Sequence, residues 1–239
     1  MTISVKNGIL SVMNPIIVYP MIYAGDKMKR VFGMIEAVFD ITYLVGGLAL
    51  SCAMLAKGYL VGALAGIVLI FGDSFHLIPR ILLILTRREK SLTKWLGYGK
   101  QITSVTMTVF YLLLWHWSDA VLEPFHGLWV FVFYLLAVLR VLLCFVPQNQ
   151  WTSPQPPVRW GIIRNIPFFS MGLIIAARLY LQRTLVQGVE WAWLFILLSF
   201  AFYLPVVLFA NRQPKVGMLM LPKTCMYIML LIILYTVPT

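Results

Sequence analysis

The sequence predicts an all-α integral membrane protein, a bundle of seven transmembrane helices with room for an eighth. The chain of 239 residues is 61% hydrophobic and only 11% charged, whereas soluble proteins are about 45–50% apolar and about 25% charged. Its mean hydropathy is +0.89. A water-facing surface cannot be built from so few charged side chains, which argues against a soluble enzyme or a nucleic-acid-binding protein.

Seven segments are apolar and continuous enough to be membrane-spanning helices, each needing about 20 residues. A helix is the only open element that satisfies its backbone hydrogen bonds inside lipid. The predicted spans cover residues 31–56, 58–85, 101–117, 128–146, 160–180, 191–210 and 216–237.

A shorter apolar segment, residues 9–24, contains Asn14, Pro15 and Pro20. These residues leave three interpretations open: a broken span, a re-entrant piece or an interfacial helix. We therefore divide the chain into an N-terminal segment, residues 1–30, and a seven-helix domain, residues 31–239.

The basic residues predict the orientation, because loops rich in Lys and Arg stay in the cytoplasm. Residues 27–30 and 87–94 are the two segments richest in basic residues, and alternation adds Arg159 and residues 212–215 to the same side. The net charge of +11 is thus interpreted as a topology signal in a multi-pass protein of the cell membrane. Arg178, near the outer end of the fifth span, is predicted to snorkel to the interface.

Charged residues inside the spans carry the most information, since each costs about 2.5–3.5 kcal/mol at the centre of a helix. In the first two spans they recur at helical spacing, so that each set shares one face. The members are Glu36, Asp40 and Tyr43 in the first span, and Asp73, His76 and Arg80 in the second. Later spans add Gln101, Arg140, Arg164 and Lys223.

The predicted orientation puts nearly all of these residues in the cytoplasmic halves of their spans. The simplest geometry is a polar cavity that opens toward the cytoplasmic leaflet. A purely structural interpretation stays open, in which pairs such as Asp73 with Arg80 join neighbouring helices.

The residue types in this layer suit acid/base hydrolysis. Two neighbouring carboxylates can divide the acid and base roles, so we predict Asp73 and Asp40 as the acid/base pair. Glu36 and His76 are predicted to support them. Arginine and lysine recognise phosphate and carboxylate groups, and the predicted substrate-binding residues are Arg80, Arg140, Lys223, Arg164, Tyr43 and Gln101.

Other chemistries have weaker support in the sequence, and we expect no metal and no cofactor. His116 and His126 fall at the outer side, away from His76, which argues against a three-histidine zinc site. Ser74 lacks the Gly-x-Ser-x-Gly elbow of a serine nucleophile. Lys223 has the position of a retinal-binding lysine, but its helix shows no further rhodopsin-like signature.

The segment FGDSFHLIPR, residues 71–80, together with Gly97, Gly99 and the pair Phe110 and Tyr111, resembles the bacterial YhhN-type lysoplasmalogenase family. Its members are small multi-helix membrane hydrolases with a Gly-Asp pair deep in one helix, then a glycine-bearing turn and an aromatic-rich helix. The resemblance implies that Asp73 is catalytic and that water attacks the vinyl-ether carbon region of a lysophospholipid.

The sequence thus predicts an integral-membrane enzyme that hydrolyses a lipid or amphipathic substrate from the cytoplasmic leaflet. Its expected partners are the lipid bilayer and an anionic lipid or amphipathic small molecule, and no nucleic acid. One alternative is a small transporter or ligand-binding membrane protein with a proton-coupled or anion-binding cavity. Another is an accessory subunit whose charges bind a partner helix.

Overall fold

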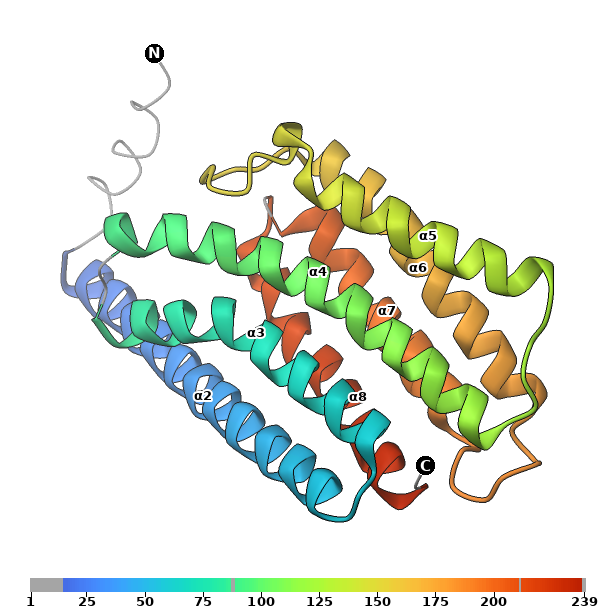
Figure 1. Ribbon diagram of the computed structural model, residues 1–239. Helices are drawn as coiled ribbons and strands as arrows, with labels where there is room; N and C mark the ends of the chain where they lie inside the picture. Colours follow the sequence, from blue (N-terminus) through green and yellow to red (C-terminus); the bar gives the residue numbers. More distant parts are fainter. Residues whose placement is uncertain (1–14, 87–88, 211, 238–239) are drawn as a thin grey trace.

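The computed structural model describes residues 15–86, 89–210 and 212–237, and it folds these residues into helices with no strand among them (Figure 1). The prediction of an all-α bundle is therefore confirmed. The α-helices of this part are α2 (Pro15–Ala56), α3 (Leu60–Thr86), α4 (Glu89–Val121), α5 (Leu128–Phe145), α6 (Val158–Leu181), α7 (Ala192–Phe209) and α8 (Met220–Thr236). Two 3₁₀ helices, η1 (Pro147–Asn149) and η2 (Pro214–Leu219), lie in the connections.

Six segments are long and apolar enough to cross a membrane, which makes the chain a multi-pass membrane protein. They are Val31–Ala56, Leu60–Thr86, Leu128–Phe145, Val158–Leu181, Ala192–Phe209 and Lys215–Thr236. Each agrees within a few residues with a predicted span. The seventh predicted span, residues 101–117, lies inside α4, which does not reach the same apolar composition.

Some of the polar side chains of helix α4 are used in contacts with neighbouring helices. The Thr103 hydroxyl donates to the Gly72 carbonyl of α3 at 2.8 Å, and the Gln101 amide donates to the Cys144 carbonyl of α5 at 3.3 Å. The helix has 33 residues and rises about 1.5 Å per residue, so it is long enough to cross. It begins at Glu89, and most of the basic segment predicted as a loop over residues 87–94 is therefore helical.

The N-terminal segment joins the first span. Helix α2 starts at Pro15 and continues without a break to Ala56, so residues 15–24 of the apolar segment 9–24 are helical and continuous with the first long span. Residues 1–14 lie outside the described residues.

The helices form a closed ring. Each helix from α2 to α8 packs against the next one in the chain, and α8 packs back against α2 and α3. At the closure, Lys57 of the α2–α3 turn donates to the Tyr235 hydroxyl of α8 at 2.6 Å. The C-terminal ends of α3, α5 and α7 lie at one end of the ring in Figure 1, and Lys94, Arg159, Arg212 and Lys215 belong to the segments at this end. We call it the basic end.

The outer surface of the ring is apolar, as contact with lipid requires. Val38, Leu142 and Leu173 are 63%, 62% and 52% exposed, respectively, and they belong to three different helices. In water such faces would be unfavourable by about 25 cal/mol for each Å² left exposed. The lipid bilayer is therefore a partner of this chain.

Arg178 does not snorkel, and the prediction for it is wrong. Its side chain is fully buried, and it donates to the Asp119 carboxylate at 2.5 Å and to the Ser118 and Glu123 carbonyls at 3.1 and 3.0 Å. The connection between α4 and α5 folds over the guanidinium, with Phe125 5.2 Å from it. Protein groups therefore satisfy the charge that the sequence assigned to the interface.

Candidate functional site

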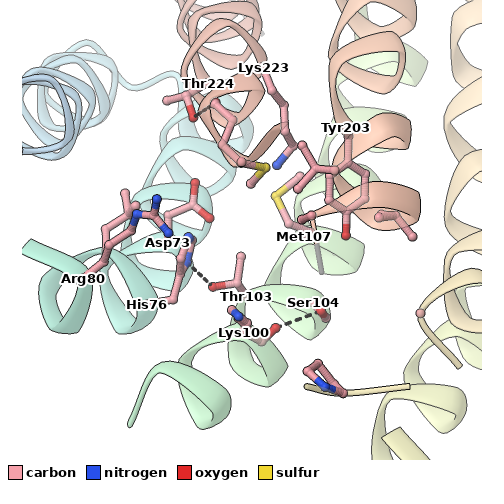
Figure 2. A pocket seen from close by; sticks show the side chains of 18 of the residues that line it. Asp73, His76, Arg80, Lys100, Thr103, Ser104, Met107, Tyr203, Lys223 and Thr224 are labelled. Atoms are coloured by element: carbon pink, nitrogen blue, oxygen red, sulfur yellow. Dashed lines mark hydrogen bonds between the residues drawn. The ribbon is translucent and has the colours of Figure 1, made fainter. Parts of the chain in front are cut away.

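A cavity of about 470 Å³ lies inside the ring and reaches the basic end. Every α-helix of the ring lines it, together with the α5–α6 connection and η2. Its volume is within the usual range of about 300–1,000 Å³ for small-molecule sites. Figure 2 shows Asp73, His76 and Arg80 on one side of this cavity and Lys223 and Tyr203 across from them.

One side of the cavity is an acidic wall, formed by Glu36 and Asp40 of α2 and Asp73 of α3. The three carboxylates lie close enough to interact electrostatically. Glu36 is paired with the Arg80 guanidinium. Asp73 accepts a hydrogen bond from the Tyr43 hydroxyl at 2.8 Å, which fixes one carboxylate oxygen and leaves the other without a hydrogen bond to a described residue.

Asp40 differs from its two neighbours because it has no protein partner in the described structure. It is only 5% exposed, and its Oδ2 atom is buried without a hydrogen bond. A buried polar atom left unpaired costs about 1–3 kcal/mol. The unpaired oxygen is therefore available to a proton, a water molecule or a substrate.

His76 is held in one tautomer by a threonine of α4. The Thr103 hydroxyl has a single hydrogen, which it donates to the Gly72 carbonyl at 2.8 Å. Its oxygen can then only accept from His76 Nδ1, 3.0 Å away, so Nδ1 carries the ring proton of the neutral imidazole. The Nε2 atom consequently has a free lone pair, as a proton acceptor requires.

Glycines bring α3 and α4 close enough for this arrangement. A Cβ atom on Gly72 would lie 1.8 Å from Thr106 Oγ1, and one on Gly99 would lie 2.2 Å from the Phe75 carbonyl oxygen and 2.7 Å from the His76 Cα. Small residues at helix contacts are how membrane bundles reach such short separations. Both Gly97 and Gly99, which the resemblance places in a turn, lie within α4.

We expect Gly99→Ala to push α4 away from α3 and to lower stability by about 1–3 kcal/mol, the usual cost of overpacking. An alanine gains up to about 1 kcal/mol of helix propensity over glycine, but here its methyl group overlaps backbone atoms that cannot rotate away. The matched control is Gly46→Ala, where nothing lies within 4 Å of the added methyl. Thermal unfolding in detergent measures both; equal midpoints would show that the close approach is not required.

Four further cations of the lining form what we call the cationic wall: Arg140, Arg164 and Lys223, and also Lys100 of α4, which lies near His76. The two arginines lie close enough to interact electrostatically, and Arg140 Nη1 donates to the Arg164 backbone carbonyl at 2.5 Å. Arg164 Nη1 donates to Asn149 Oδ1 at 2.9 Å. Lysine and arginine on this wall complement the carboxylates across the cavity, so that an anionic group and a reacting group can be held at the same time.

Much of the remaining lining is apolar. An apolar wall comes from α7 and the start of α8, with Val206, Val207 and Leu221 among its members. Toward the other end the ring is filled by an aromatic plug of mutually contacting rings, each at most 8% exposed. The plug consists of Phe110, Tyr111, Phe168, Phe200 and Tyr227.

The structure gathers most of the predicted site residues around this cavity. Two of them do not line it. The Tyr43 hydroxyl donates a hydrogen bond to Asp73, and the Gln101 side-chain amide donates one to the Cys144 carbonyl. Those that line it are Glu36, Asp40, Asp73, His76, Arg80, Arg140, Arg164 and Lys223.

Sequence reasoning missed several other lining residues. Lys100 lies just before the third predicted span and was not selected as a site residue, although its charge was the available signal. Nothing in the sequence indicated that Tyr203 and Trp151 line a site, because aromatic residues are common in and beside membrane-spanning segments. In the described part of the chain, no group of three His, Cys, Asp or Glu side chains is placed to hold a metal ion.

No family model, curated protein or solved structure matches this chain. The chemistry of the site must therefore be argued from its own residues.

Proposed function

We propose that the protein is a membrane-embedded hydrolase that admits an amphipathic, anionic substrate at its basic end, the expected cytoplasmic side. The observation that carries this proposal is the pairing of two unlike surfaces in one cavity. Asp40, Asp73 and the free Nε2 of His76 line one side, and the cationic wall lines the other. The resemblance of residues 71–80 to lysoplasmalogenases agrees with it and suggests lysophospholipids as the first substrates to test.

In the proposed reaction Asp73 is the general base and His76 orients the water. The water donates one hydrogen bond to His76 Nε2 and transfers its other proton to Asp73 as its oxygen bonds to the electrophilic carbon of the substrate. Protonated Asp40 gives its proton to the leaving oxygen of an ester. In a vinyl ether it gives the proton to the β-carbon, which makes the α-carbon electrophilic, and the hemiacetal formed with water then breaks down to an aldehyde and an alcohol. Transfer of the new proton from Asp73 to Asp40 then restores the starting state, so protons and atoms balance.

The closed aromatic plug supports an enzyme over a transporter. Tyr111 and Tyr227 are fully or almost fully buried, and their hydroxyl oxygens lie 3.5 Å apart directly across the ring. A substrate that enters at the basic end therefore meets packed side chains below the cavity. A transporter with the same residues would need a second state in which this plug opens.

The test is hydrolysis by the purified protein in detergent, with a panel of single-chain phospholipids that carry ester or vinyl-ether links. We expect release of the chain or its aldehyde, detected by mass spectrometry, and loss of that release in Asp73→Asn. Glu123→Gln is the matched control, since it makes the same acid-to-amide change at an exposed position outside the cavity.

The same preparations in sealed vesicles separate the two functions. If detergent-solubilised protein cleaves nothing in the panel while vesicles accumulate a solute only when Asp73 is intact, the protein is a transporter and the proposal is wrong.

A further inference from the structure

The cations of the cavity are not neutralised by its carboxylates. Among the described residues, the ion pairs within 4.0 Å are Arg80 with Glu36 and Arg178 with Asp119. Only the first of these lies at the cavity. In the described structure no member of the cationic wall therefore has a carboxylate oxygen within 4.0 Å, although Lys223 lies near enough to Asp73 to interact with it electrostatically. Taken together, the lining has five basic and three acidic side chains, a formal excess of two positive charges.

Three of these cations lie against the faces of aromatic rings rather than against carboxylates. The Arg164 guanidinium lies 4.0 Å from the centre of the Trp151 ring, and Arg140 lies 5.3 Å from that of Phe168. Lys223 Nζ lies 4.9 and 5.0 Å from the rings of Tyr203 and Tyr227. A ring face attracts a cation without using its N–H donors or cancelling its charge.

Donors on this wall remain unused although they are buried. The Nε atoms of Arg140 and Arg164 are inaccessible and have no hydrogen-bond partner in the described structure. Arg140 itself is only 2% exposed. A guanidinium has five N–H donors arranged to fit an oxyanion, and among the described residues each of these two makes a hydrogen bond through Nη1. The Nη2 donors are therefore the groups that an anion in the cavity would use.

We infer that the cationic wall is a binding site for a phosphate monoester. The excess of positive charge is two when all three carboxylates are ionised and three when Asp40 is protonated, as in the proposed reaction. A phosphate monoester carries about 1.5 to 2 negative charges at pH 7 and so balances more of this excess than a phosphodiester or a carboxylate, which carries only one. Arginine pairs suit phosphate because they bind two of its oxygens in parallel. This inference names the substrate class of the proposed hydrolase and in that sense rests on it, but binding itself needs no catalysis.

The phosphate can belong to a single-chain lipid or to a small soluble molecule. The apolar wall begins beside the cations, with Val207 and Leu221 in the same lining as Arg164 and Lys223. A hydrocarbon chain attached to the phosphate would bury apolar surface there, at about 0.8 kcal/mol for each CH₂ group. The two sources therefore differ in affinity and are separable by measurement.

The experiment measures binding to the Asp73→Asn protein in detergent, so that no turnover interferes. The probes are single-chain glycerol phosphate, the same lipid with a phosphocholine head group, a fatty acid of equal chain length, and glycerol 3-phosphate. We expect the lipid monoester to bind about tenfold or more tightly than the phosphocholine lipid or the fatty acid, as the loss of one charged hydrogen bond predicts. Equal affinity for the three lipids would overturn the inference.

Variants locate the site. We expect Arg164→Gln and Arg140→Lys to weaken binding of the monoester about tenfold or more, with Arg140→Lys included because it keeps the buried charge. Arg159→Gln is the control, since Arg159 is exposed and does not line the cavity. Loss of binding in Arg159→Gln equal to that in Arg164→Gln would mean attraction by net charge only, and would overturn the assignment.

The remaining outcomes separate the source of the phosphate from the proposed hydrolysis. Tight binding of glycerol 3-phosphate equal to that of the lipid supports the site and identifies a soluble ligand. Hydrolysis of phosphocholine lipids by the wild-type protein without preference for the monoester overturns the inference and leaves the hydrolase standing. Monoester binding with no hydrolysis of any lipid supports the inference and overturns the hydrolase.

Discussion

Arg178→Met is expected to lower the free energy of unfolding by about 3–5 kcal/mol, the usual cost of removing one partner from a buried charged network. The side chain is fully buried and makes hydrogen bonds to Asp119 and to the Ser118 and Glu123 carbonyls. Methionine keeps most of the volume but supplies no donor. The carbonyls of the α4–α5 connection then lose their partner, and that connection no longer closes the end of the bundle opposite the basic end.

Unfolding in detergent by increasing denaturant or temperature measures this loss. Arg183→Met is the matched control, because Arg183 lies in the same region but is part-exposed and donates only to the Tyr180 carbonyl three residues away. We expect that control to change stability by less than about 1 kcal/mol, as is usual away from the core. Similar losses in both variants would show that the Arg178 network is not a stabilising element.

The burial of Arg178 could not be predicted from the sequence. A basic residue near the end of an apolar segment ordinarily reaches the interface, and nothing local in the sequence opposes that. The difference comes from residues 118–125, which are 53 or more positions away in the chain and fold over the guanidinium in the structure. Such a long-range contact has no periodic signature.

The acidic side of the cavity was largely predictable because its residues repeat at helical spacing. The four-residue step from Glu36 to Asp40 places them on one face, and depth along the spans brings Asp73 to the same level. Hydrogen bonds were not predictable. Tyr43 donates to Asp73 instead of lining the cavity, and Arg80, predicted to bind substrate, is paired with Glu36.

The cationic side was predictable only in part, because its main feature is that its cations have no carboxylate at ion-pair distance. The sequence shows Arg140, Arg164 and Lys223 as intramembrane charges, and the simplest expectation is that carboxylates pair with them. Rings such as Trp151 and Tyr203 take that place in the structure. Aromatic residues are too common in membrane segments for this role to be recognised before the fold is known.

The cavity has chemically different sides because the helices that surround it contribute different kinds of side chain. Helices α2 and α3 supply carboxylates and a histidine, α4 to α6 and α8 supply cations, and α7 supplies apolar surface. The ring order places these three kinds of side chain around one space. Under the proposed function, the ligand is amphipathic and anionic and its reactive bond lies toward Asp73.

Asp73→Asn is expected to lower the rate of hydrolysis by about 10²–10⁴-fold, the usual contribution of a positioned general base. Asparagine has nearly the same shape and can still accept the hydrogen bond from Tyr43, but its amide cannot take a proton from water. The fold should persist, since the carboxylate makes no ion pair within 4.0 Å in the described structure. Single-turnover hydrolysis of the best lipid substrate measures the effect at saturating lipid.

Tyr43→Phe tests how much the hydrogen bond that holds Asp73 contributes to the rate of hydrolysis. The Tyr43 hydroxyl is buried and donates to one oxygen of Asp73 at 2.8 Å, so phenylalanine leaves the base in place but frees its carboxylate to rotate. We expect a smaller loss than in Asp73→Asn, about tenfold, as removal of one hydrogen bond of about 1.5 kcal/mol predicts. If Tyr43→Phe were as inactive as Asp73→Asn while both stayed folded, the tyrosine hydroxyl would itself transfer the proton, and Asp73 would be the residue that positions it.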